Sequence, residues 1–188
     1  FQVSQIKRFG DPDLNELIGR VWGETRTTPQ EMQISIDQLK KSLSGSVLAE
    51  AELGNGHRLF KKTCQNCHRL FGEGEKIGPD LTGSNRNDLD YLLSNMIDPS
   101  GIVAKDYRMT ILLTTDNRLF NGLVTDETAR TISIQTATER ITFDKQKIQE
   151  RKETEKSPMP DGLLDTLSAT DIRDLVSYLQ QPTKITVE

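Results

Sequence analysis

The sequence predicts a mainly helical fold that is interrupted by a small antiparallel β domain. Apolar residues recur every three or four positions around residues 53–60 and 172–179, as on the buried face of an amphipathic helix. Residues 107–143, between these stretches, alternate apolar and polar side chains and are rich in threonine and isoleucine, which favours strands. The two patterns together predict helices on both sides of an inserted set of strands.

The first 45 residues predict a separate N-terminal segment of two amphipathic helices. The second helix is expected to begin at a capping box formed by Thr28 and Glu31, with Pro29 at its first position. Apolar residues have helical spacing at Leu14, Leu17, Ile18, Val21 and Trp22 in the first helix and at Met32, Ile36, Leu39 and Leu43 in the second. Two such helices cannot hide their apolar faces completely from each other, so we expect them to pack on another part of the protein or on a preceding domain.

Three further helices are expected in the main helical part. We expect the first and the last to cross at Gly56, because a residue without a side chain lets another helix approach closely, with Phe60 and Tyr178 near the contact. Ser168 and Asp171 predict a capping box at the start of the last helix. The third helix is predicted at residues 89–97.

Residues 64–68 read Cys-Gln-Asn-Cys-His, which is the pattern of covalent c-type haem attachment. The thiols of Cys64 and Cys67 would each add to one vinyl group of the porphyrin, and His68 would supply the proximal iron ligand. The alternatives are a structural zinc site, which needs a second ligand pair, and a redox dithiol, which needs a βαβ unit. Haem is favoured because these are the chain's two cysteines and the other histidine, His57, lies on the same segment.

A second iron ligand is predicted at Met159, which stands between Pro158 and Pro160 just before the last helix. The two prolines stiffen the loop, so the thioether could reach iron without a large loss of entropy. Two alternatives stay open: Met159 covers haem or core surface without binding, or His57, otherwise expected to be an exposed helical residue, is the ligand. The other methionines are expected in the core: Met32, Met96 and Met109.

The order of these motifs resembles a class I cytochrome c. The haem motif is followed by Ile-Gly-Pro-Asp-Leu-Thr-Gly at residues 77–83, by the Met-Pro loop and by a terminal amphipathic helix. The resemblance implies one covalent haem c and its iron, with His68 and Met159 as axial ligands. It also implies that the backbone carbonyl of Pro79 accepts a hydrogen bond from the other ring nitrogen of His68.

A closer resemblance is to the haem-binding domains at the C-terminal ends of large planctomycete and verrucomicrobial proteins. Similar stretches are found here at residues 98–100, 159–164 and 174–179, and the resemblance covers about residues 46–183. Such domains are often joined to dehydrogenase-like or other large domains. The resemblance therefore implies that electrons are passed on within a larger protein.

Residues 103–157 do not belong to a minimal cytochrome. Five short strands, the last near residues 147–152, predict a small antiparallel β barrel, SH3-like or Sm-like, inserted before the Met159 loop. The insert carries ten Lys/Arg and nine Asp/Glu, so a surface for nucleic acid is not indicated. We expect a structural cap on the haem or a module that docks a partner.

These observations predict a mainly α cytochrome c fold with an inserted β barrel and an N-terminal helical segment. The expected domains are an N-terminal segment at 1–45, cytochrome parts at 46–102 and 158–188, and the insert at 103–157. The expected function is a one-electron carrier with His/Met ligation, or the electron-accepting domain of a larger protein, and not an enzyme. The alternative is a haem enzyme, or a gas or redox sensor, in which Met159 is displaced.

The charge pattern gives an expectation about partners. The whole chain has a formal charge of −4, but the haem motif is surrounded by more basic than acidic side chains. These residues are Arg58, Lys61, Lys62, Arg69 and Lys76, opposed by Glu73 and Glu75. Such a basic rim would steer the exposed haem edge to an acidic redox partner, unless the charges are ordinary solvated ones.

The chain has no apolar run of transmembrane length and does not begin with a signal peptide. Because it starts at Phe1, we expect a mature protein or an excised fragment. Haem attachment of this type takes place outside the bacterial cytoplasm, so the resemblance implies a periplasmic or other extracytoplasmic compartment.

Overall fold

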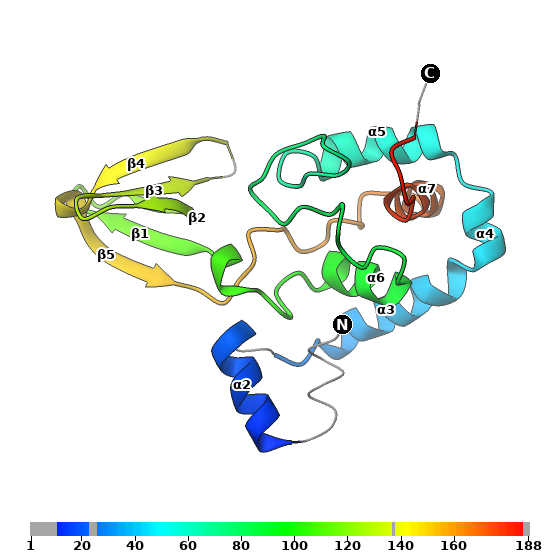
Figure 1. The fold of residues 1–188 in the computed structure, drawn as a ribbon, viewed down its shortest axis with the longest axis horizontal. Coiled ribbons are helices and arrows are strands. Elements are labelled where there is room, and N and C mark those ends of the chain that lie inside the picture. Colours follow the sequence, from blue (N-terminus) through cyan, green and yellow to red (C-terminus); the bar gives the residue numbers. More distant parts are fainter. Residues whose placement is uncertain (1–10, 23–25, 137, 186–188) are drawn as a thin grey trace. The chain divides into compact units, whose positions relative to one another are not determined.

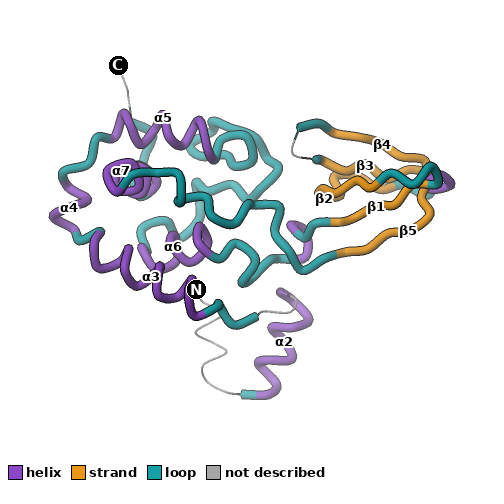
Figure 2. Tube along the Cα trace, turned by 180° about the vertical axis from the view of Figure 1, so that it is seen from behind, coloured by secondary structure: helices purple, strands orange, loops and turns teal. Residues whose placement is uncertain are grey.

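The computed structural model describes residues 11–22, 26–136 and 138–185, and Phe1 therefore lies outside the described residues. The chain forms two compact units. Of the described residues, the helical unit contains Thr27–Asp98 and residues 161–185, and the sheet unit contains residues 11–22, Arg26 and Pro99–Pro160. Figures 1 and 2 show the helices of the first unit and the strands of the second. No helix in the described ranges is long and apolar enough to cross a membrane.

The helical unit contains five of the described helices. They are α3 (Gln30–Ser42), α4 (Gly45–Ala49), α5 (Leu53–Thr63), α6 (Leu89–Ile97) and α7 (Ala169–Leu179). The helices predicted at residues 53–60, 89–97 and 172–179 are thereby confirmed. The predicted capping box of α7 is also confirmed, because the side chains of Ser168 and Asp171 each accept a hydrogen bond from the other's backbone N–H.

Helices α5 and α7 lie against each other (Figure 1), and their backbones come closest at Gly56, as predicted. A Cβ atom added at Gly56 would lie 2.2 Å from the backbone oxygen of Asp174 and 2.6 Å from the Cβ of Tyr178. The rings of Phe60 and Tyr178 pack beside this contact, with their centroids 5.7 Å apart. Both aromatic side chains are almost completely buried. The glycine is therefore required by the close approach of the two backbones.

A buried carboxylate ties the same two helices together. Asp174 on α7 is 1 % exposed and accepts hydrogen bonds from the backbone N–H of Glu52 (3.1 Å) and from the Nδ2 of Asn55 (2.8 Å) at the start of α5. The Nε of Arg173 donates a third bond at 2.9 Å. Burial alone would raise the pKa of Asp174, but these hydrogen bonds outweigh it and hold the pKa below its ordinary value.

Helix α3 packs on α6 through the predicted apolar stripe, in which Ile36 and Leu43 are buried. An ion pair between Lys40 and Asp90 (2.5 Å) joins the two helices at the surface. The predicted capping box at the start of α3 was wrong. Pro29 itself is the N-cap residue, with no side-chain capping bond, so Glu31 comes one position too early for the box.

The sheet unit contains one open antiparallel sheet with the strand order β4-β3-β2-β1-β5. The strands are β1 (Thr110–Thr114), β2 (Leu119–Glu127), β3 (Thr131–Gln135), β4 (Arg140–Asp144) and β5 (Ile148–Glu153). Short 3-10 turns, η1 (Lys105–Tyr107) and η2 (Lys145–Lys147), precede β1 and join β4 to β5. The core of the sheet consists of Leu112, Ile132 and Ile134, which are all buried.

The predicted closed barrel, whether SH3-like or Sm-like, was wrong. Strands β4 and β5 meet at η2 and then diverge as the two edges of the sheet (Figure 1). Closure requires the two edge strands to pair along their length. Strand β5 is a charged edge: its residues after Ile148 are all exposed, and four of these five are charged. Charged side chains keep an edge strand hydrated and disfavour its pairing with another strand.

The described part of the N-terminus contains the two predicted helices. Helix α2 (Pro12–Trp22) belongs to the sheet unit, whereas α3 belongs to the helical unit. Ile18 on α2 is buried, but Leu14 and Leu17 are 39 % and 55 % exposed. The apolar face of α2 is therefore only partly covered within the described residues.

Candidate haem-attachment site

The haem motif begins where α5 ends. Cys64 is the C-cap residue of this helix, and its N–H donates to the carbonyl of Phe60 at 2.8 Å. The carbonyl of Cys64 then accepts from the N–H groups of Cys67 (3.0 Å) and His68 (2.8 Å). This tight turn places both cysteines and the histidine on one short, hydrogen-bonded piece of backbone. The packed helix α5 anchors that piece at its N-terminal end.

The two cysteines have free thiols in different surroundings. The Cys64 side chain is buried, whereas the Cys67 side chain is exposed. Burial raises the pKa of the Cys64 thiol, and partial loss of water around the Cys67 sulfur raises its pKa as well. A catalytic dithiol needs a thiolate of lowered pKa. Neither the raised pKa values nor the antiparallel sheet of the other unit favours the dithiol alternative.

A backbone carbonyl fixes the tautomer of the His68 ring. Its Nδ1 lies 2.9 Å from the carbonyl oxygen of Pro79. Because a carbonyl can only accept, Nδ1 carries the proton, and the neutral ring has its lone pair on Nε2. This is the arrangement of a histidine that binds a metal through Nε2. The residues therefore fit an iron ligand at this position.

The backbone before Pro79 lies directly against the His68 ring. A Cβ atom at Gly78 would be 2.6 Å from the Cε1 of His68, so a side chain there would push the ring away. The N–H of Gly78 also donates to the carbonyl of Cys67 at 2.7 Å. Sequence reasoning found Pro79 but missed Gly78. The adjacent pair Gly-Pro was the available signal.

His57 is not the exposed histidine that the sequence suggested. Its side chain is 19 % exposed, and its Nε2 lies 3.2 Å from the carboxylate of Glu73. The imidazole also packs on Tyr178, with ring centroids 5.2 Å apart. Glu73 accepts a second bond from Lys184 at 2.6 Å, and the bonds from Lys184 and His57 lower the pKa of Glu73. His57 is therefore engaged in fixing the loop that follows His68.

The structure brings Cys64, Cys67, His68 and Pro79 together in the helical unit, while Met159 belongs to the sheet unit. Met159 is half-buried in an irregular stretch, and its N–H donates to the hydroxyl of Ser157 at 3.1 Å. The N–H of Ser157 in turn donates to the hydroxyl of Ser100 at 3.2 Å. The loop is thus held in place, and the role of Met159 as distal ligand stays a prediction.

The other methionines differ in burial. Met96 is 5 % exposed in α6, as expected for a core residue. Met32 and Met109 are half-buried, and the backbone of Met109 forms hydrogen bonds with Thr154 and Lys156.

In the part of the chain that the structure describes, no three or more His, Cys, Asp or Glu side chains are grouped so that they could hold a metal ion.

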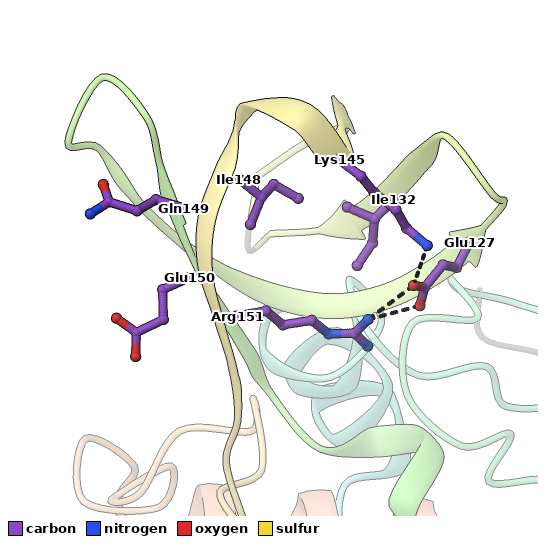
Figure 3. Close-up of a pocket in the computed structure, with 7 residues that line it drawn as sticks. All are labelled: Glu127, Ile132, Lys145, Ile148, Gln149, Glu150 and Arg151. Atoms are coloured by element: carbon purple, nitrogen blue, oxygen red, sulfur yellow. Dashed lines mark hydrogen bonds and ion pairs between the residues drawn. The ribbon is translucent and has the colours of Figure 1, made fainter.

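A surface pocket of about 340 Å³ lies in the sheet unit, and its lining contains none of the residues of the haem motif. It is lined by Glu127, Ile132, Lys145, Ile148, Gln149, Glu150 and Arg151. Figure 3 shows Lys145 and Arg151 converging on Glu127, at 2.7 and 2.9 Å. Hydrogen bonds from Lys145 and Arg151 lower the pKa of Glu127. Glu127 is therefore an ionised carboxylate that is already paired twice.

Comparison with known families identifies the segment that contains the motif. Residues 53–110 match the cytochrome c family. This cytochrome c segment includes Cys64, Cys67, His68 and Pro79 and ends before Met159. The match supports a c-type cytochrome with covalent haem c and iron that takes part in electron transfer. No curated protein matches the chain.

Proposed function

We propose that the chain is a one-electron carrier with a single haem c attached to Cys64 and Cys67, and with His68 and Met159 as axial ligands. The hydrogen bond between His68 Nδ1 and the Pro79 carbonyl is the observation that carries the proposal. Together with the cytochrome c segment, it supports a histidine prepared to bind iron through Nε2.

The roles of the chain's own residues follow from this arrangement. Cys64 and Cys67 would hold the haem at the end of α5, and the Pro79 carbonyl keeps the His68 ring in one tautomer and orientation. When bound, the haem supplies an iron that accepts and releases one electron. A second ligand at Met159 would fill the last position on the iron and raise its reduction potential relative to two nitrogen ligands.

The context of the electron transfer is also a proposal. The exposed side chains of Lys61, Lys62 and Lys76 support docking of an acidic redox partner, and Glu73 is already paired with Lys184. Glu75 and Asp80 are also exposed in this part of the chain and offset part of this positive charge. We infer an extracytoplasmic compartment and an electron-accepting role within a larger dehydrogenase-like protein, as in the planctomycete and verrucomicrobial domains that the sequence resembles.

Mass measurement tests the covalent attachment. Protein made in cells with an active haem-attachment system should keep its colour after denaturation and have the mass of the polypeptide plus one haem. The variant Cys64→Ala/Cys67→Ala should lose this colour, because no thioether bond can form. A wild-type protein with the mass of the polypeptide alone would contradict the proposal.

Substitution of Met159 tests the distal ligand. Met159→Ala should remove the far-red charge-transfer band of ferric iron–thioether, lower the reduction potential and open the iron to carbon monoxide. Met109→Ala is the matched control, because Met109 is also a half-buried methionine of the sheet unit and should change none of these properties. Rapid carbon monoxide binding to the reduced wild type would favour the enzyme or sensor alternative instead.

A further inference from the structure

Arg86 is a buried cation beside the segment that carries Pro79. Its side chain is 6 % exposed, and it has no ion pair with any carboxylate of the described residues. It donates instead to four backbone carbonyl oxygens. These are Leu81 (from Nε, 2.6 Å), Thr82 (from Nη2, 3.2 Å), Gln181 (from Nη1, 2.9 Å) and Leu179 (from Nη1).

Two of the four carbonyls explain why a cation can be buried there. Leu179 is the last residue of α7, and the last carbonyls of a helix are left without intrahelical partners and carry partial negative charge, while Gln181 follows directly after the C-cap residue. The planar guanidinium can bind the end of α7 on one side and the loop on the other. It also lies 5.0 Å from the ring centroid of Phe71, which covers one face.

The other two carbonyls belong to residues that follow Pro79 closely. Leu81 is two residues and Thr82 three residues beyond Pro79. The opposite side of this short segment is bound to the chain after His68, because Leu81 N–H donates to Arg69 (2.8 Å) and Phe71 N–H donates to the Thr82 hydroxyl (2.9 Å). Residues 79–82 are therefore held between the haem motif and the end of α7.

We propose that Arg86 is a positioning residue, which keeps the Pro79 carbonyl on His68 Nδ1 and thereby tunes the reduction potential of the iron. The inference rests on the proposed haem function. A hydrogen bond to Nδ1–H makes the ring a stronger electron donor and favours ferric iron. Weakening that bond without removing the charge should therefore raise the potential.

The substitution Arg86→Lys separates position from charge. Lysine keeps the positive charge but cannot reproduce the planar fork that binds both the loop and α7. We expect the His68 Nδ1–H proton of the reduced protein, followed by NMR, to exchange roughly tenfold faster with solvent, as loss of one charge-assisted hydrogen bond would give. The reduction potential should rise in the same variant.

Arg118→Lys is the matched control. Arg118 also lies over an aromatic ring, that of Phe120 at 5.4 Å, but it is exposed and lies in the sheet unit. This variant should leave both the exchange rate and the potential unchanged. A purely structural role of Arg86 would lower only the thermal stability of Arg86→Lys, and that result would overturn the proposal.

A measurement on the wild type keeps the inference testable if the variant does not fold. The His68 Nδ1–H proton and the Arg86 Nε–H proton should exchange with similar protection, because both are released when the same loop opens. A His68 proton with much lower protection than that of Arg86, each taken relative to the intrinsic exchange rate of its own group, would show that Arg86 does not hold it. Absence of haem from the wild type would instead contradict the proposed function, and mass measurement distinguishes the two failures.

Discussion

The helical unit and the sheet unit are held together in different ways. The sheet unit has backbone ladders that pair every neighbouring strand from β4 to β5 over a small apolar core, and its Glu127 ion pairs lie at the surface. In the helical unit, residues 64–88 form no helix or strand element, although they carry the haem motif and the Pro79 segment. That stretch depends on single hydrogen bonds and on the buried side chain of Arg86, while the buried carboxylate of Asp174 joins α5 to α7.

This difference predicts which substitutions destabilise each unit most. A ladder distributes its stability over many equivalent bonds, so the sheet should be damaged mainly by loss of apolar volume. The helical unit places a close helix crossing and buried charges next to the haem motif. Small changes of shape or charge there leave backbone clashes or buried groups without partners, which are the costly cases.

Gly56→Ala should give the largest effect. The added Cβ would overlap the backbone of Asp174, which cannot move without separating α5 from α7. We expect the helical unit to lose about 4 kcal/mol, more than overpacking usually costs, because the obstruction is backbone. Chemical unfolding followed by the Soret absorption of the attached haem would measure this loss.

Gly45→Ala is the control within the same unit. Gly45 begins α4, and an added Cβ would meet nothing within 4 Å. Its stability should change by no more than about 0.5 kcal/mol. If Gly56→Ala and Gly45→Ala lowered the stability equally, the α5–α7 crossing would not be the most sensitive point of the helical unit.

Leu112→Ala should give the next largest effect and should act on the other unit. Leu112 is completely buried in the core of the sheet, and its truncation should cost about 3 kcal/mol through lost contacts and a cavity. Hydrogen exchange of the strand amides should report this loss, while the haem remains attached. Leu119→Ala is the control, because Leu119 is 70 % exposed. An equal loss of stability in the haem-bearing unit would show that the two units unfold together.

The helices could be predicted because their information is local. A stripe of apolar residues and an isolated glycine were sufficient for α5, α7 and their crossing at Gly56. The strands were also predicted from local alternation, but the barrel was not present. Closure depends on whether β4 and β5 pair, and no alternation within a single strand contains that information.

Strand β1 shows a second limit of local patterns. Ile111 and Leu113 are part of its apolar series, yet the buried face of this internal strand contains Thr110, Leu112 and Thr114. Both faces of the strand carry apolar residues, so the sequence alternation does not decide which face is inward. The threonine hydroxyl at position 114 is accommodated by bonding to Asp116 and to the Arg118 carbonyl.

The candidate site was predictable to the extent that covalent chemistry requires a fixed spacing. Cys64, Cys67 and His68 follow from that requirement, and Pro79 followed from the family resemblance. Arg86 was missed because it stands in a polar loop without periodicity. Asp174 had a signal, since it is an acidic residue beside the apolar stripe of α7, where burial requires hydrogen-bond partners.

The last prediction compares one carboxylate from each unit, Asp174→Asn and Glu127→Gln. Asp174→Asn keeps the shape but removes a buried charge that accepts three hydrogen bonds, and it should cost about 2 kcal/mol at neutral pH. Glu127 is 35 % exposed and paired at the surface, where water screens the charges, so Glu127→Gln should cost less than about 1 kcal/mol. Chemical unfolding at several pH values would measure both.

The stability losses of Asp174→Asn and Glu127→Gln should both depend on pH. Because the pKa of Asp174 is lowered in the folded protein, its stabilising effect is complete above the ordinary aspartate pKa of about 3.9 and is lost as the pH falls through the folded value. The difference between wild type and Asp174→Asn should therefore be constant near neutrality and shrink in acid. A difference that did not shrink would mean that the loss does not come from the charge of Asp174, but from the amide NH2 group that the substitution places against the donors of Glu52, Asn55 and Arg173. Since the pKa of Glu127 is lowered as well, Glu127→Gln should show the same sign with a smaller amplitude.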